Sequence, residues 1–172
     1  LSADGLVAGA TLLGSFQRDT DLAAGASYVS NKQIVLPVLA DGTYRLIVVT
    51  DAGGTVYERG AEANNTVVAT ATLDLRHANL VVDTVTAVGA AQSGTSFDAT
   101  WTVRNAGTGM TPADWADRVY LSTDATLGAG DTLLGERAHT GVLNPSETYN
   151  ATLTVTLPNG ISGTYYLIVK TD

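Results

Sequence analysis

The feature that most constrains the fold of this chain is an internal repeat. The segment LSADGLVAGATLLG (1–14) aligns with LSTDATLGAGDTLLG (121–135) with one gap. The alignment then holds at an offset of 121 residues to the end of the chain, where DGTYRLIVVTD (41–51) matches SGTYYLIVKTD (162–172). In all, 22 of 51 aligned positions are identical. Self-similarity at a fixed period indicates a repeat architecture, so we expect parts of two copies of a unit of roughly 120 residues.

The same alignment predicts the domain boundaries. Residues 1–76 correspond to the C-terminal part of one repeat, and residues 77–172 to most of the next repeat, which lacks its final strand. The first copy lacks its opening, and the second stops where the first continues into 52–73. Because the chain also opens on Leu1 and not on Met, we expect it to be a window from a longer tandem array.

The hydrophobic pattern is that of β-strands. Apolar residues alternate with Asn and Thr along 149–157, and 95–105 alternates in the same way, as half-buried strands do. Further strands are expected at 28–36, 43–50, 55–58, 66–73, 79–88, 117–122 and 164–171. Only TPADWAD (111–117) is expected to form a short helical turn. About seven short strands per repeat predict an all-β fold of tandem immunoglobulin-like antiparallel β-sandwiches.

Charge and composition exclude several classes of function. The formal net charge is −8, so the chain repels nucleic-acid backbones and anionic membrane surfaces. There is no cysteine, which excludes disulfides, thiolate metal sites and a cysteine nucleophile. No apolar run reaches the roughly 20 residues that span a bilayer. We therefore expect no nucleic-acid partner and no membrane insertion.

Several segments carry a resemblance to a known family. They are WTVRNAGTG (101–109), VYLSTD (119–124) with GDTLLG (130–135), and YERGAEANN (57–65). Together they resemble the CARDB domain, a cell-adhesion-related domain of bacteria, over essentially the whole chain. The resemblance implies immunoglobulin-like sandwiches in tandem in large prokaryotic surface proteins, with a role in adhesion and no catalytic residues. It places the protein outside the cell, on the bacterial surface.

Two aspartates of LSTDATLGAGDTLLG form a candidate calcium site. Asp124 and Asp131 lie seven residues apart in a glycine-containing loop, and Asp117 precedes the same loop. Calcium takes six to eight oxygen ligands, which carboxylates, carbonyls and water supply. The alternative is that these aspartates stabilise turns by accepting bonds from their own backbone. In the first copy Ala10 stands in place of Asp131, which argues against a metal site in every repeat. Calcium is the only cofactor that the sequence suggests.

The two tryptophans have different expected roles. Trp101 lies on the inward side of the strand at 95–105 and is expected in the core. Trp115 lies in the loop predicted at 111–117, either as a ligand-binding platform or as an anchor that plugs one end of the sandwich. His77 and His139 are the only histidines. They are expected in separate loops at the surface, with no catalytic partner.

No nucleophile with a neighbouring base and no phosphate-binding loop is present, so we expect no enzyme. The main hypothesis is a structural or adhesive repeat segment in a stalk or fibre, whose partners are neighbouring repeats of the same or another copy. A second hypothesis is a filament-forming subunit, because an incomplete sandwich offers an open edge for strand addition from another chain. A third is a module whose end loops bind a glycan or protein of a host or biofilm surface.

Overall fold

The computed structural model describes residues 1–112 and 114–171. The chain divides into two compact units, Leu1–Leu75 and Arg76–Asp172, so the division falls one residue before the boundary predicted from the repeat. Both units are built from β-strands, and all the strand pairs are antiparallel. Within the described residues no helix is long and apolar enough to cross a membrane.

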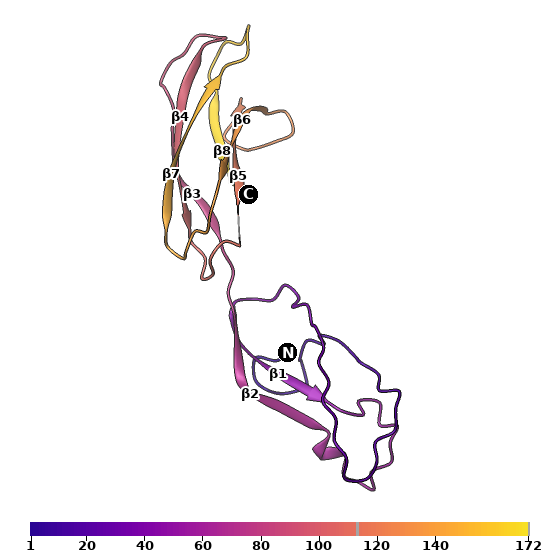
Figure 1. Cartoon of the computed structure of the whole chain (residues 1–172). Helices are drawn as coiled ribbons and strands as arrows, with labels where there is room; N and C mark the ends of the chain where they lie inside the picture. Colours follow the sequence, from indigo (N-terminus) through magenta and orange to yellow (C-terminus); the bar gives the residue numbers. More distant parts are fainter. Residues whose placement is uncertain (113, 172) are drawn as a thin grey trace. The chain divides into compact units, whose positions relative to one another are not determined.

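The second unit contains two three-stranded sheets (Figure 1). One sheet has the order β3-β4-β7 and the other the order β6-β5-β8. The chain crosses between the sheets after β4, after β6 and again after β7. The strands are β3 (Leu80–Thr86), β4 (Ser96–Asn105), β5 (Trp115–Ser122), β6 (Thr132–His139), β7 (Thr148–Thr156) and β8 (Tyr166–Lys170).

The core of the second unit lies between these sheets. Alternation sends every second side chain of β4 inward, so that Ala99, Trp101 and Val103 are buried. Ala151 and Val155 of β7 lie beside them, and Val119 of β5 and partly buried residues of β6 and β8 pack from the other sheet. The expectation that Trp101 fills the core is confirmed, since it is 2% exposed.

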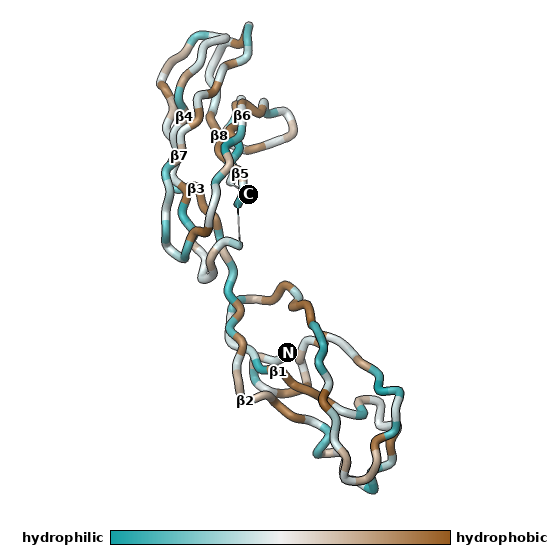
Figure 2. Tube along the Cα trace, in the orientation of Figure 1, coloured by the Kyte–Doolittle hydropathy of each residue, from teal (hydrophilic) through white to brown (hydrophobic). Residues whose placement is uncertain are grey.

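The first unit contains less regular structure. β1 (Gly42–Val49) pairs with β2 (Thr66–Leu75), and a single 3-10 turn, η1 (Glu62–Asn64), precedes β2. Beyond β2, β1 meets the chain start through a bridge between Arg45 and Ser2. The second half of β1, Leu46 to Val49, is strongly apolar (Figure 2), yet Val48 is 55% exposed. Among the described residues of this unit only Leu1 and Ser2 are buried, so the unit has almost no core.

Two predicted strands are wrong. Segments 28–36 and 55–58 form no strand. The repeat alignment sets 28–36 against β7, and β7 is held in its sheet by β4 alone. The described part of the first unit offers no strand beside 28–36. Because a strand needs a partner for its backbone groups, the expected strand does not form there.

Three further expectations need correction. β6 was missed, because the sequence TLLGERAH does not alternate. The helical turn predicted at 111–117 is wrong, because Trp115 to Asp117 already belong to β5; Ala113 lies outside the described residues. His139 was expected in a loop, but it ends β6. The other predicted strands each overlap an observed one.

Candidate functional sites

Asp124 and Asp131 flank the loop that joins β5 to β6. Asp124 Oδ1 accepts a 2.7 Å bond from the backbone N–H of Thr126, and Asp131 Oδ2 accepts one of 2.7 Å from Gly128. The Gly128 N–H, and then the hydroxyl of Ser122, hold the pKa of Asp131 below its ordinary value. Both carboxylates therefore already act as turn acceptors, as the alternative to calcium proposed.

The loop borders a hollow of about 310 Å³. Its lining includes Asp124 and Asp131 of this loop, and Pro158, Ile161 and Tyr165 from the segment between β7 and β8. Two carboxylates and the loop's carbonyls are the oxygen donors that calcium prefers. Calcium binding at Asp124 and Asp131 stays a prediction.

Asp117 does not join these two aspartates. It is fully buried in β5. Among the described residues no group of three or more acidic, histidine or cysteine side chains is arranged to hold a metal ion. Asp117 therefore lies in the core and not at the hollow that Asp124 and Asp131 line, and its part in a calcium site stays a prediction.

In the core, Asp117 accepts two hydrogen bonds on one oxygen. Oδ2 receives the indole N–H of Trp101 at 2.7 Å and the hydroxyl of Tyr149 at 2.5 Å. Oδ1 has no partner within the described part of the chain. Burial, followed by the bond to Asp117, raises the pKa of Tyr149. The carboxylate thus joins β4, β5 and β7, and so connects the two sheets.

Trp115 lies next to this network, half-buried at the start of β5 and not in a loop. Its ring stacks on His139, with 4.1 Å between ring centroids, and its indole N–H donates a 3.2 Å bond to the Tyr149 hydroxyl. His139 also lies 4.1 Å from the Tyr149 ring. One face of the indole is therefore occupied by the protein itself. Ligand binding by Trp115 stays a prediction, and its contacts are those of an anchor.

Asn105, at the end of β4, is a key residue that the sequence analysis did not single out. It is fully buried, and its side chain makes four hydrogen bonds. Its amide nitrogen donates to the carbonyls of Gly109 (2.8 Å) and Leu143 (3.0 Å). Its oxygen accepts the N–H groups of Asn79 and Gly107, each at 3.0 Å. The signal was present in WTVRNAGTG, where an asparagine precedes two closely spaced glycines.

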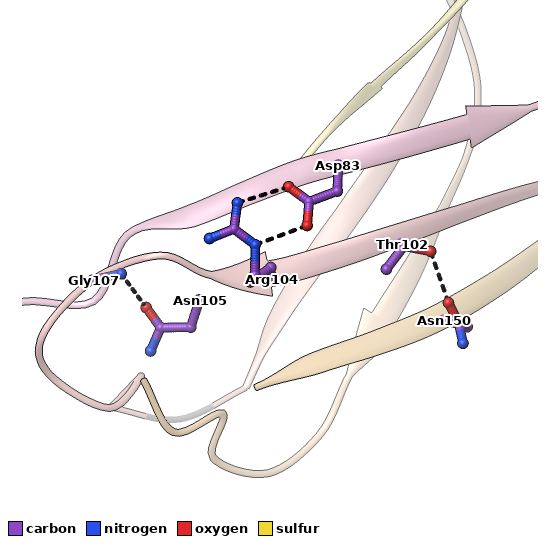
Figure 3. Close-up of polar contacts among 6 residues, drawn as sticks. All are labelled: Asp83, Thr102, Arg104, Asn105, Gly107 and Asn150. Atoms are coloured by element: carbon purple, nitrogen blue, oxygen red, sulfur yellow. Dashed lines mark hydrogen bonds and ion pairs between the residues drawn. The ribbon is translucent and has the colours of Figure 1, made fainter. Parts of the chain in front are cut away.

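Figure 3 shows Asn105 beside two exposed cross-strand pairs. Arg104 of β4 makes two bonds to Asp83 of β3, at 2.8 and 3.0 Å, and lowers the pKa of that aspartate. Thr102 donates a 2.7 Å bond to Asn150 of β7. Exposed pairs of this kind stabilise little, whereas a saturated buried amide stabilises much more.

The loop that Asn105 organises lies against the segment Arg76–Asn79. The N–H groups of Thr108 and Gly109 donate to His77 O at 3.0 and 2.9 Å, and Ala106 N–H donates to Asn79 O at 2.7 Å. A Cβ on Gly107 would overlap the backbone of His77 and Asn79. Gly107 and Gly109 are therefore required by the close approach of the segment Arg76–Asn79 to this loop.

Comparisons with known proteins add little to this geometry. No protein-family model and no curated protein matches the chain. Among solved structures, a β-glucosidase 3B from Thermotoga neapolitana, in complex with α-D-glucose, is similar with a TM-score of 0.29 and 17% identity. That similarity covers 49% of this chain and 11% of the glucosidase chain. A similarity of this size carries no conclusion about fold or activity.

Proposed function

We propose that the chain is a structural and adhesive segment of a large extracellular protein of the bacterial surface, built from tandem immunoglobulin-like repeats of the CARDB type. The observation that carries this proposal is a bridge that recurs in both units. Ser2 pairs with Arg45 in the first unit, and Ser122 pairs with Tyr166 in the second. The sequence alignment independently sets Ser2 against Ser122 and Arg45 against Tyr166.

The turn after this bridge also recurs. Asp4 Oδ1 accepts the N–H two residues on, that of Leu6, at 2.9 Å, as Asp124 does from Thr126. The two turns differ where the sequences differ. Ala10 replaces Asp131, and the Ser2 hydroxyl donates instead to Asp4, at 2.6 Å. The two units are thus proposed to be parts of one repeated fold, in which β1 is the counterpart of β8.

The sandwich is proposed to be immunoglobulin-like on two grounds. Two three-stranded antiparallel sheets face each other, and the chain crosses between them three times. The second ground comes from the first unit, where the Tyr44 hydroxyl donates a 3.0 Å bond to Ala40 O, four residues upstream. A tyrosine at the start of a strand that bonds back in this way is a tyrosine corner, which is characteristic of these sandwiches.

A repeat segment in a stalk or fibre needs connections with little slack. β2 ends at Leu75 and β3 begins at Leu80, and His77 and Asn79, two of the four intervening residues, are hydrogen-bonded to the Asn105 loop of the second unit. A connection held in this way behaves as part of the second unit and not as a flexible linker. This favours a spacer role over a freely jointed chain.

Labelling of cells tests the proposal. Antibodies raised against the chain should bind intact cells of the bacterium that makes it, and adding protease to intact cells should remove the signal. An antibody against a cytoplasmic protein serves as the control for cell integrity. Labelling that requires permeabilised cells would contradict the proposed location and, with it, the structural and adhesive role.

A further inference from the structure

The outer edge of β7 is an unpaired sheet edge in the interior of the sequence. β7 is the last strand in the order β3-β4-β7, and among the described strands only β4 pairs with it (Figure 1). The strands before and after it in the chain, β6 and β8, belong to the other sheet. In the first unit β2 lies beside β1, the proposed counterpart of β8. A repeat that includes the counterpart of β2 therefore adds that strand beside β8 and leaves the edge of β7 unpaired.

The hydrogen bonds to β4 determine which backbone groups lie on this edge. Asn105 N–H donates to Glu147 O, and Leu157 N–H donates to Thr95 O, each at 3.0 Å. In an antiparallel strand, alternate residues point their N–H and C=O groups to opposite sides. The odd-numbered residues of β7 therefore bond to β4, and the even-numbered residues direct both backbone groups to the outer edge.

One side chain confirms this direction. The guanidinium of Arg137 on β6 donates a 3.3 Å bond to the carbonyl of Thr152, an even-numbered residue of β7. The side chain of Arg137 is exposed, so a partner strand can displace it. The residues that offer backbone groups to such a strand are Thr148, Asn150, Thr152, Thr154 and Thr156.

β7 lacks the features that keep edge strands from pairing with other chains. Natural edge strands carry charged side chains, prolines or bulges, or are very short. β7 has nine residues, TYNATLTVT, with no charge and no proline, and its register with β4 has no shift. At the opposite edge of the sheet, β3 carries Asp83 and a register shift beside it. In the other sheet, the edge strand β6 carries Glu136 and Arg137.

We propose that the outer edge of β7 pairs with the same edge of a second copy of this chain. The strands are antiparallel, with Thr152 opposite its own copy and Asn150 opposite Thr154. An edge that meets itself about a two-fold axis brings outward-pointing backbone groups together on both sides. The two β3-β4-β7 sheets then form one continuous sheet. The pairing needs only the second unit, but as a source of adhesion between copies it rests on the proposed function.

Charge and side chains favour a second copy as the occupant. The formal net charge of −8 makes copies repel one another over most of their surface. Pairing through β7 sets no like charges opposite each other, because the strand is uncharged. The side chains that meet on the outer face are threonines and one asparagine, and threonine pairs across strands are favourable. An acidic or basic peptide would find no opposite charge on β7 itself.

Amide hydrogen exchange of the full chain at low and high concentration tests this pairing. Exchange at Asn150, Thr152 and Thr154 should slow by at least about tenfold as concentration rises. Exchange at Ala151 and Leu153 should stay the same, because their N–H groups already bond to β4. Sedimentation velocity of the same samples should show the chain passing from one copy to two.

A pair of matched variants locates the contact. Thr152→Lys sets two like charges directly opposite each other at the two-fold axis, so it should abolish the slowing at Asn150 and Thr154. Thr100→Lys is the control, since Thr100 is the partner of Thr152 on the same face but lies on β4, inside the sheet. This variant should associate as the wild type does. Slow exchange at Ala151 and Leu153 shows in each variant that the sheet is intact.

The contradicting results are distinct. Edge amides that exchange at one rate up to millimolar concentration overturn the proposal even if the mass rises, because the copies would then associate through another surface. Equal slowing in Thr152→Lys and the wild type overturns it as well. The wild-type exchange pattern decides the matter if a variant fails to fold. The labelling of cells depends on none of these results, so failure of the pairing and failure of the proposed function are distinguishable.

Discussion

The indole N–H of Trp101 donates a 2.7 Å hydrogen bond to Asp117 Oδ2, and both residues are almost or wholly inaccessible to solvent. The bond joins β4 in one sheet to β5 in the other. Because Tyr149 of β7 donates to the same oxygen, one buried carboxylate organises three strands. Removing it leaves two donors without an acceptor inside the core.

Asp117→Ala is therefore expected to destabilise the second unit by about 3 kcal/mol, because each buried donor that is left without an acceptor costs ~1–3 kcal/mol. Urea denaturation followed by tryptophan fluorescence measures the change. Asp98→Ala is the matched control, since Asp98 makes an exposed bond to Thr154; it should cost less than about 0.5 kcal/mol. Equal stabilities for the two variants would show that the network does not hold the sheets together.

The tyrosine in this network makes stability depend on pH in the alkaline range. Burial, followed by the bond to Asp117, raises the pKa of Tyr149 above its ordinary value, so the unfolded chain loses the proton first. The contribution is fully present below about pH 10 and is lost as the pH rises further. Melting temperature against pH should fall above that value less steeply in Tyr149→Phe than in the wild type. Tyr57→Phe, at an 87% exposed position, should leave the profile unchanged, and identical profiles for all three would contradict the assignment.

Asn105→Ala should be among the most destabilising substitutions in the second unit. It removes four hydrogen bonds and leaves the buried carbonyl of Leu143 without this donor, at a cost of about 3 kcal/mol or more. Thermal and urea unfolding measure it. The control is Asn150→Ala, which removes the exposed bond from Thr102 that Figure 3 draws, with an expected cost of a few tenths of a kcal/mol. A mild effect at Asn105 would mean that the loop does not depend on its side chain.

Gly107→Ala tests the packing of the segment Arg76–Asn79. A Cβ at Gly107 would overlap the backbone of His77 and Asn79, which cannot rotate away as a side chain can. We expect a loss of stability of about 1–3 kcal/mol and faster amide exchange at Thr108 and Gly109. Gly130→Ala meets no atom within 4 Å and should change neither quantity. Normal exchange rates in Gly107→Ala would show that this contact is not fixed.

Strand positions were predictable where a strand also has a partner. Alternation at 95–105 and 149–157 predicted β4 and β7, which pair with each other along their length. Segment 28–36 aligns with β7 but forms no strand, because pairing is a non-local requirement that a local pattern does not contain. β6 is the opposite case. Its sequence has no period, and its pairing with β5 determines its structure.

Candidate sites were predictable as residue types but not as groupings. Asp117, Asp124 and Asp131 are close in sequence, but β5 turns Asp117 into the core while the other two flank a loop. The stacking of Trp115 on His139 depends on the register of β5 and β6, which sets these two residues opposite each other. Register between strands follows from packing and turns, so neither contact could be predicted from spacing along the chain.

The central claim is that the two units are parts of one repeated fold, and the most direct measurement is hydrogen exchange on an extended chain. The extended chain carries a second copy of residues 52–75 directly after Asp172, the position that the alignment matches to Asp51. If β8 is the counterpart of β1, the added segment forms a fourth strand beside β8, slows exchange at the amides of Leu167 and Val169 by at least about tenfold, and raises the melting temperature of the second unit. Unchanged exchange at both amides and an unchanged melting temperature would contradict the equivalence of the two units.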